Sequence, residues 1–197
     1  ASVKRENFIS EKLKDYAYED APLPLIRGKT ISQPTTVMIM TSALEINRGE
    51  KIFEIGTGSG YQAAVLAKLT GDAGKVISTE VVPELVEFSK SNFKKSDINN
   101  IEVYECDGSK GMKNEVLFDK IIITCAAFET VKILEQTRKV AWRINSMHPS
   151  SLGLHPIVYF YSQDGRYKIA SFYAIIDFIQ YLENKSRYQD FIKIRPK

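Results

Sequence analysis

Apolar runs and amphipathic segments alternate through the middle of this 197-residue chain. Strands are expected where apolar and β-branched residues follow one another, at 51–55, 75–80, 101–106 and 119–124. Helices are expected where apolar residues recur at helical spacing, at 34–45, 61–69, 83–95 and 130–141. Strands that alternate with helices indicate an α/β fold. The pattern therefore predicts a doubly wound, mostly parallel sheet.

The last third of the chain has a different pattern. Strand-like runs at 157–162 and 167–176 are separated by Gln163-Asp164-Gly165-Arg166. Asp-Gly between two such runs is typical of a β-hairpin, so an antiparallel hairpin is expected at the edge of the sheet. Residues 138–156 fit no pattern and stay unassigned, and residues 1–34 are loop-rich. We expect residues 1–197 to form a single domain.

Composition narrows the class of protein. With 44% hydrophobic and 26% charged residues, the chain resembles a soluble globular protein, and a net charge of +3 is too small to indicate a nucleic-acid partner. No run approaches the length of a membrane span, and no leader sequence is recognisable, so no membrane association is expected. Cys106 and Cys125 lack metal-ligand spacing and are expected to be buried thiols of a cytoplasmic protein. Because the chain begins at Ala1 rather than Met, we expect processing or truncation.

A glycine-rich turn follows the first of the expected parallel strands. Its sequence is Glu54-Ile55-Gly56-Thr57-Gly58-Ser59-Gly60-Tyr61. Alternate glycines permit a sharp turn and a close approach of the backbone to a ligand, although a purely structural turn is the alternative. A dinucleotide fingerprint needs glycine where Tyr61 stands, and no Gly-Lys-Ser/Thr follows, which excludes a P-loop.

This turn resembles the first motif of the class I S-adenosylmethionine-dependent methyltransferases. The resemblance implies a Rossmann-like fold, S-adenosylmethionine as cofactor and S-adenosylhomocysteine as product. The residues of the turn expected at the cofactor are Glu54, Gly56, Thr57, Gly58, Ser59 and Gly60.

Polar groups also stand at the ends of the other expected strands. Glu80 ends the second strand, and its carboxylate can accept hydrogen bonds from both hydroxyls of a ribose. Asp107 and Gly108 follow the third strand, where a carboxylate can accept from an adenine amino group and glycine permits close approach. The alternatives are a solvated strand end for Glu80 and an ordinary turn for Asp107-Gly108. Together these strand ends favour a nucleotide-like ligand.

The end of the fourth strand bears on the methyl acceptor. Thr124-Cys125-Ala126-Ala127 offers no amide or carboxylate to hold an amine, and no carboxylate cluster for a metal ion, so no metal is expected. The two histidines lie in the unassigned stretch. A carboxylate acceptor would need no general base, because with a pKa near 4 it is already ionised at neutral pH. Its methylation would depend on positioning and desolvation.

A second motif, at residues 22–34, resembles a known family. Pro22-Leu23-Pro24-Leu25 leads to Gly28-Lys29-Thr30-Ile31-Ser32-Gln33-Pro34, which is similar to the P-L-P-I and G-x-T-I-S-x-P segments of the protein-L-isoaspartate O-methyltransferases. Val3-Lys4-Arg5, Tyr61-Gln62 and Asp107-Gly108 extend the resemblance. It implies methylation of isoaspartyl carboxylates in damaged proteins and peptides, which starts their repair. It also implies that Ser32 is the active-site serine, whereas an N-cap of the helix at Pro34 is the alternative.

The same resemblance implies which residues form the substrate side of the site. They are Thr30, Ile31, Ser32, Cys125, Ala126 and Ala127. The resemblance weakens over residues 129–156, where the family's Gly-Gly turn before a fifth strand is missing. Two alternatives therefore stay open: a methyltransferase for another acceptor, such as RNA or a small molecule, and a non-catalytic cofactor-binding domain. The sequence does not define the oligomeric state.

Overall fold

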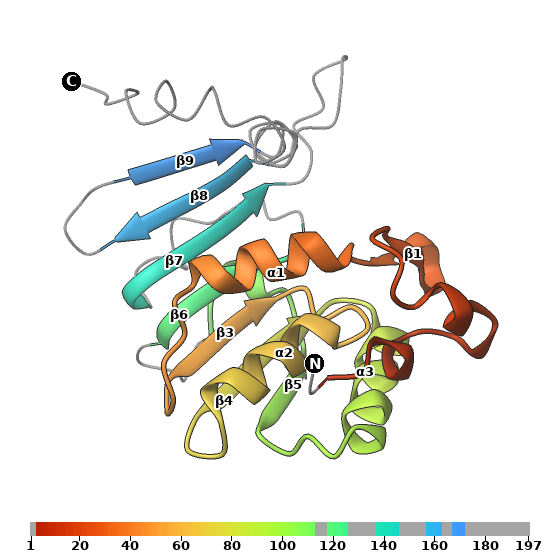
Figure 1. The fold of residues 1–197 in the computed structure, drawn as a ribbon. Coiled ribbons are helices and arrows are strands. Elements are labelled where there is room, and N and C mark those ends of the chain that lie inside the picture. Colours follow the sequence, from red (N-terminus) through yellow and green to blue (C-terminus); the bar gives the residue numbers. More distant parts are fainter. Residues whose placement is uncertain (1–2, 113–117, 126–136, 146–156, 163–166, 172–197) are drawn as a thin grey trace.

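A twisted sheet runs through the computed structural model, which describes residues 3–112, 118–125, 137–145, 157–162 and 167–171 (Figure 1). In this part of the chain the sheet has seven strands in the order β5-β4-β3-β6-β7-β8-β9. Their bounds are β3 Lys51–Ile55, β4 Lys75–Glu80, β5 Ile101–Glu105, β6 Phe118–Ile123, β7 Thr137–Asn145, β8 Ile157–Ser162 and β9 Tyr167–Ser171.

The direction of the strands confirms the predicted sheet. β3 pairs in parallel with β4 and β6, β4 with β5, and β6 with β7. β8 is antiparallel to β7, and β9 is antiparallel to β8, which confirms the antiparallel pair; the turn at 163–166 and residues 172–176 lie outside the described residues. The chain passes outward from β3 to β4 and β5 and then returns to β6 beside β3. The order of strands therefore reverses between β3 and β6, which is where ligands bind in open α/β sheets.

Three helices occur in the described part of the chain, at α1 Pro34–Ala43, α2 Tyr61–Thr70 and α3 Pro83–Lys95 (Figure 1). Proline occupies the first turn of α1 and α3, where its missing N–H costs nothing. The loop-rich N-terminal segment contains short 3₁₀ turns and a small antiparallel pair. These are η1 Arg5–Phe8, η2 Glu11–Tyr16, β1 Leu23–Pro24, η3 Ile26–Gly28 and β2 Thr30–Ile31. A further turn, η4 Gly108–Lys110, follows β5.

The helix predicted at 130–141 is wrong over residues 137–141, which belong to β7. Val140, Trp142 and Ile144 alternate with polar or small residues, and this period of two suits a strand. Pairing with β6 on one side and β8 on the other outweighs the helical propensity of Arg138, Lys139 and Ala141. The chain therefore has a fifth parallel strand although no Gly-Gly turn precedes it. Residues 130–136 and 146–156 lie outside the described residues.

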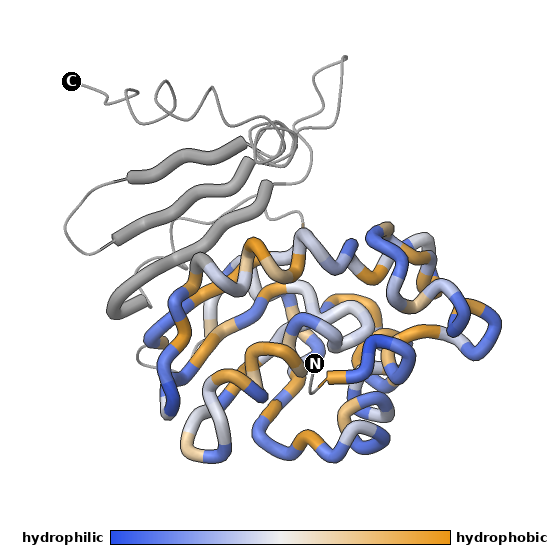
Figure 2. Tube along the Cα trace, in the orientation of Figure 1, coloured by the Kyte–Doolittle hydropathy of each residue, from blue (hydrophilic) through white to orange (hydrophobic). Residues whose placement is uncertain are grey.

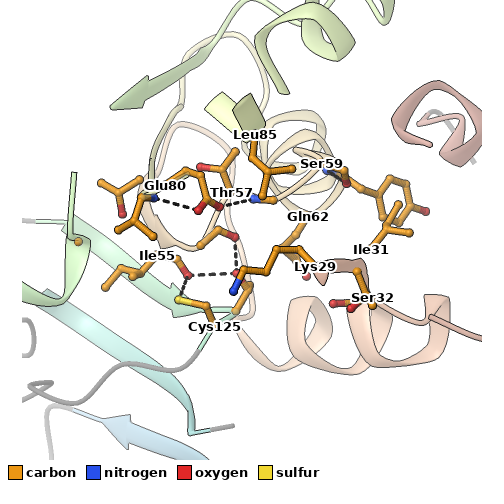
Figure 3. Close-up of a pocket in the computed structure, with 18 of the residues that line it drawn as sticks. Lys29, Ile31, Ser32, Ile55, Thr57, Ser59, Gln62, Glu80, Leu85 and Cys125 are labelled. Carbon is orange, nitrogen blue, oxygen red and sulfur yellow. Dashed lines mark hydrogen bonds between the residues drawn. The ribbon is translucent and has the colours of Figure 1, made fainter. Parts of the chain in front are cut away.

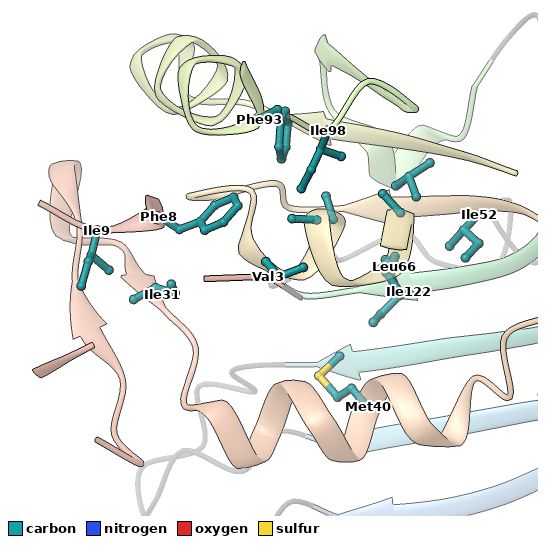
Figure 4. Packing of buried hydrophobic residues seen from close by; sticks show 14 of the residues in the cluster. Val3, Phe8, Ile9, Ile31, Met40, Ile52, Leu66, Phe93, Ile98 and Ile122 are labelled. Atoms are coloured by element: carbon teal, nitrogen blue, oxygen red, sulfur yellow. The ribbon is translucent and has the colours of Figure 1, made fainter. Parts of the chain in front are cut away.

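Apolar side chains cover both faces of the sheet along β3, β4 and β6. On one face, Ile52 and Ile122 pack with Leu66 of α2 and Phe93 of α3 (Figure 4). A second cluster on the opposite face contains Phe53, Ile55, Ile77, Phe118, Ile121 and Ile123. Neighbouring residues of one strand thus serve opposite faces, as the pleat requires. Figure 2 shows hydrophobic positions along the central strands and the helix faces turned toward them, and hydrophilic positions around the outer turns.

The N-terminal segment is anchored on this core by Phe8. Its fully buried ring lies 5.5 Å from the ring of Tyr61 in an edge-to-face arrangement and 6.4 Å from that of Phe93. Burial of an aromatic ring of this size stabilises a domain by several kcal/mol. Phe8 therefore fixes the path of the segment that leads to residues 28–32.

Candidate functional site

A cavity of about 520 Å³ opens at the carboxyl ends of β3, β4, β5 and β6, at the point where the strand order reverses (Figure 3). Most of its lining comes from five parts of the chain: the glycine turn after β3, the end of β4, the residues after β5, the residues after β6, and residues 28–32. The sequence placed its candidate residues on these same segments. The cavity therefore brings together motifs that are far apart in the sequence.

Glycine is favoured at each of the three positions of the turn for a different physical reason. A Cβ on Gly56 would lie 2.8 Å from Cβ of Cys125, and a Cβ on Gly60 would lie 2.5 Å from the ring of Phe93. A Cβ on Gly58 would meet no heavy atom within 4 Å, yet its φ of 54° still favours glycine. Gly56 and Gly60 thus serve packing, and Gly60 does not line the cavity. Gly58 is the point at which the backbone lies open to a ligand.

Glu80 ties the glycine turn to the end of β4. Its Oε2 accepts a hydrogen bond from the Gly58 N–H at 2.9 Å, and its Oε1 accepts from the N–H groups of Val81 and Val82 at 2.9 and 3.1 Å. The residue is only 8% exposed, so the alternative of a solvated strand end is wrong. Because a carboxylate oxygen has two acceptor positions, Oε2 keeps one for a ligand.

Asp107 closes a turn and lines the cavity as well. Its Oδ1 accepts from the backbone N–H of Ser109 at 3.0 Å and from the Ser109 hydroxyl at 2.6 Å. The hydrogen bond from the Ser109 hydroxyl is the main reason why the pKa of Asp107 is lowered. A Cβ on Gly108 would lie 2.0 Å from Oγ1 of Thr79, so the chain passes there only as glycine. The turn at Asp107 therefore forms part of the cavity wall.

Glu54 lies behind the glycine turn and does not line the cavity. It is fully buried, and Oε2 accepts from the hydroxyl of Ser78 at 2.5 Å. Burial raises the pKa of Glu54 to about 8, and the charge of Glu80 adds to the rise. The hydroxyls of Ser78 and Thr57 are 2.5 Å apart. Glu54, Ser78 and Thr57 thus form a hydrogen-bonded chain of buried side chains behind the glycine turn.

The segment after β6 closes the cavity beside the turn. The Thr124 hydroxyl donates to the carbonyl of Gly56 at 2.6 Å. Burial raises the pKa of the Cys125 thiol to about 12, so it is protonated at neutral pH. The expectation of buried core cysteines is wrong, because Cys106 is exposed, Cys125 is half-buried, and both line the cavity. Ala126 and Ala127 lie outside the described residues.

Thr30, Ile31 and Ser32 line the cavity, and Ile31 and Ser32 lie on the side opposite Glu80 (Figure 3). The alternative role of Ser32 as a helix cap is wrong. The N-cap residue of α1 is Gln33, and the backbone N–H of Thr35 in the first turn donates to the carboxylate of Asp20 at 2.9 Å. Among the described residues, no hydrogen bond of the Ser32 hydroxyl is found. Its hydroxyl is therefore available to a ligand in the cavity.

Other residues of the cavity were not predicted as site residues. They are Gly28, Lys29, Val37, Ile55, Tyr61, Gln62, Thr79, Val81, Leu85, Cys106, Ser109 and Thr124. Most stand next to a predicted residue in the sequence, and that proximity could have revealed them. Val37 and Leu85 come from the first turns of α1 and α3, and only the packing of these helices brings them to the cavity.

The fold, with this cavity at the glycine turn, is that of the class I methyltransferases. One solved protein-L-isoaspartate O-methyltransferase superposes with a TM-score of 0.70 at 26% sequence identity, over 84% of this chain and 55% of that chain. A second structure, from Plasmodium falciparum and assigned to the same family, was solved with S-adenosyl-L-homocysteine. It gives a TM-score of 0.68 at 22% identity and covers 86% of this chain and 82% of that chain, which supports the fold.

Sequence comparison defines the family. Residues 1–139 match the family model described as protein-L-isoaspartate(D-aspartate) O-methyltransferase, and the chain belongs to this family. A protein-L-isoaspartate O-methyltransferase of Ignicoccus hospitalis is 46% identical over 138 residues, which are 70% of this chain and 65% of the relative. Protein-L-isoaspartate O-methyltransferase 2 of Archaeoglobus fulgidus is 45% identical over 69% of this chain and 63% of the relative. The chain thus spans slightly less than two thirds of the length of these relatives.

Within the described ranges, no helix combines the length and the apolar character that crossing a membrane requires. The same residues contain no group of three or more His, Cys, Asp or Glu side chains that could hold a metal ion.

Proposed function

We propose that this chain transfers a methyl group from S-adenosylmethionine to the free carboxylate of L-isoaspartyl residues in damaged proteins and peptides, leaving S-adenosylhomocysteine. One observation carries the proposal: the Thr30-Ile31-Ser32 run and the glycine turn line one cavity. Family membership supports it, as does the relative solved with S-adenosyl-L-homocysteine. We propose a cytoplasmic location because the described cysteines are free thiols.

The cavity residues suit S-adenosylmethionine. Gly58 permits close approach of the ligand, Glu80 keeps an acceptor position for a ribose hydroxyl, and Asp107 can accept from an adenine amino group. Ile55 and Leu85 supply apolar surface for a planar ring. The cavity of about 520 Å³ is within the range of small-molecule sites. The ligand has no phosphate and carries positive charge, which suits a wall that contains two carboxylates.

The reaction makes few chemical demands on the protein. When bound, S-adenosylmethionine supplies a methyl group on a positively charged sulfur. An acceptor carboxylate is already ionised at neutral pH, so no side chain needs to remove a proton. Ser32 can donate a hydrogen bond to one carboxylate oxygen and orient the other toward the methyl group. The neutral Cys125 thiol is also important, because a thiolate in the same wall would be a competing nucleophile.

Transfer of a labelled methyl group tests the proposal. We expect label on a synthetic isoaspartyl peptide and none on the matched peptide with a normal aspartyl residue. Equal labelling of both peptides, or of neither, contradicts the proposal. Label on RNA or on small acceptors would instead favour the alternative methyltransferase. Cofactor binding by calorimetry without any turnover would favour a non-catalytic binding domain.

Ser32→Ala tests the role of the hydroxyl. We expect kcat for the isoaspartyl peptide to fall about tenfold, the equivalent of one hydrogen bond of about 1.4 kcal/mol, while the cofactor Kd stays within about twofold. Ser42→Ala is the matched control, because Ser42 is exposed on α1 and does not line the cavity. An unchanged kcat in Ser32→Ala would remove Ser32 from the proposed site.

A further inference from the structure

Two charged side chains of the N-terminal segment hold the chain on both sides of Ser32. We propose that Arg5 and Asp20 are positioning residues that fix the Ser32 hydroxyl at the cavity. The inference rests on the proposed function, in which Ser32 binds the acceptor carboxylate. It adds that this serine depends on residues well upstream in the chain, neither of which lines the cavity.

Arg5 binds the backbone of Ser32, shortly before α1 begins. Its side chain is fully buried, and Nη2 donates to the carbonyl of Ser32 at 3.0 Å. The same guanidinium donates to the carbonyl of Ala17 at 2.5 Å and to that of Ala21 at 3.1 Å. Its carbon centre lies 6.0 Å from the ring centroid of Tyr61, a residue of the cavity wall. Arg5 therefore links Ser32 to the loop at 17–21 and to the start of α2.

Asp20 holds the residues that follow Ser32. Its Oδ1 accepts from the backbone N–H of Thr35 at 2.9 Å. Its Oδ2 accepts from the Thr35 hydroxyl at 2.7 Å and from Nε2 of Gln33 at 2.9 Å. A carboxylate at this position also suits the positive end of the α1 dipole. Asp20 therefore fixes the start of α1 directly after Ser32.

The two contacts converge on one loop. Arg5 binds the carbonyls at both ends of the loop at 17–21, and Asp20 belongs to that loop. Ser32 has its carbonyl held by one residue and its C-terminal neighbours held by the other, while its hydroxyl has no partner among the described residues. This arrangement orders the backbone and leaves the hydroxyl free. A displacement of about 1 Å at a reacting centre can reduce a rate about 100-fold, so loosening this loop should affect catalysis.

A cycle of variants separates positioning from general stability. Asp20→Asn keeps the shape of the side chain but replaces an acceptor with a donor, and we expect kcat for an isoaspartyl peptide to fall about fivefold to tenfold. The cofactor Kd should change less than twofold. In a Ser32→Ala background, Asp20→Asn should cause no further fall in kcat, because the group that it positions is gone. Equal falls in both backgrounds would overturn the inference. Glu19→Gln, at the exposed neighbouring residue, is the matched control.

The role of Arg5 is tested by comparing a conservative variant, Arg5→Lys, with the uncharged variant Arg5→Met. Arg5→Lys retains the charge but cannot reach three carbonyls with one fork, so we expect a kcat between those of the native chain and Arg5→Met. If Arg5→Met does not fold, Arg5→Lys decides: a kcat equal to that of the native chain would overturn the role of Arg5.

Amide hydrogen exchange gives a readout that needs no turnover. Asp20→Asn should increase the exchange rate of the amides of residues 31–33 and 35 about tenfold, and Glu19→Gln should not. Unchanged exchange in Asp20→Asn overturns the positioning role even if the native chain is active. If the native chain does not methylate isoaspartyl peptides while amide exchange in Asp20→Asn rises as expected, the proposed function is overturned. The backbone restraint by Asp20 is then still established.

Discussion

The buried carboxyl of Glu54 gives a prediction that links stability to pH. Glu54 is fully buried on β3, Ser78 donates to Oε2, and Oε1 has no partner among the described residues. Burial raises its pKa from the ordinary value of 4.5 to about 8. Between these values the folded chain holds a proton that the unfolded chain has lost. The contribution of Glu54 to stability is therefore present below pH 4.5 and is lost as the pH rises toward 8.

The size of the effect follows from the pKa shift. One pH unit corresponds to about 1.36 kcal/mol, so an interval of 3.5 units, from 4.5 to about 8, corresponds to about 4 to 5 kcal/mol. Glu54→Gln has nearly the same shape and cannot ionise. We expect the free energy of unfolding of the native chain, relative to Glu54→Gln, to fall by about this amount between pH 4.5 and 8. Above pH 8 the difference should become constant.

Urea denaturation at half-unit steps from pH 4.5 to 9 measures this difference. Glu87→Gln, an exposed carboxylate on α3, is the matched control and should differ from the native chain by no more than about 0.5 kcal/mol at each pH. If the difference between the native chain and Glu54→Gln does not change with pH, the reasoning is refuted, because Glu54 would then have the same affinity for protons folded and unfolded. A difference that grows in favour of the native chain as the pH rises would show that the folded state favours the ionised carboxylate.

Three further predictions concern the cavity and the glycine turn beside it. Glu80→Ala should weaken S-adenosylmethionine binding by about 1 to 3 kcal/mol in calorimetry, because the glycine turn loses its charged acceptor; unchanged affinity would contradict this contact. Gly60→Ala, with a φ of 87° and a Cβ 2.5 Å from Phe93, should lower the free energy of unfolding by about 2 to 5 kcal/mol, and no loss in urea denaturation would contradict the packing. Alkylation at pH 8 should modify exposed Cys106 before Cys125, whose pKa is raised to about 12; equal rates in peptide mass spectrometry would contradict this order.

Local sequence determined most of the elements. The strands at 51–55, 75–80 and 157–162 and the helix at 83–95 have the predicted bounds. The strands are rich in apolar or β-branched residues, and the helix has an amphipathic pattern that begins at proline. Such signals depend on neighbours along the chain. The glycine turn and the polar strand ends at Glu80 and Asp107 could be predicted for the same reason, because each consists of residues that are neighbours in the sequence.

Contacts between distant residues decided what the sequence left open. Thr137–Asn145 is a strand because β6 and β8 pair with it, and no residue within the segment could supply those hydrogen bonds. Glu54 belongs to the glycine motif by sequence, yet the pleat of β3 directs it into the protein, where Ser78 is its partner. Burial of a side chain is a property of the packed layers and not of a motif.

Ser32 shows most clearly what the sequence determines and what only the tertiary structure decides. The sequence alone allowed a helix cap or a site residue, because a serine before Pro34 suits both. The structure excludes the helix cap. Asp20, which lies 15 residues before Thr35, accepts the hydrogen bond from the Thr35 N–H that a capping serine would accept. The sequence thus predicted candidate residues, most of which line the cavity. Only the tertiary structure decided which of their polar groups are already paired and which are free for a ligand, because that depends on side chains brought together from distant parts of the chain.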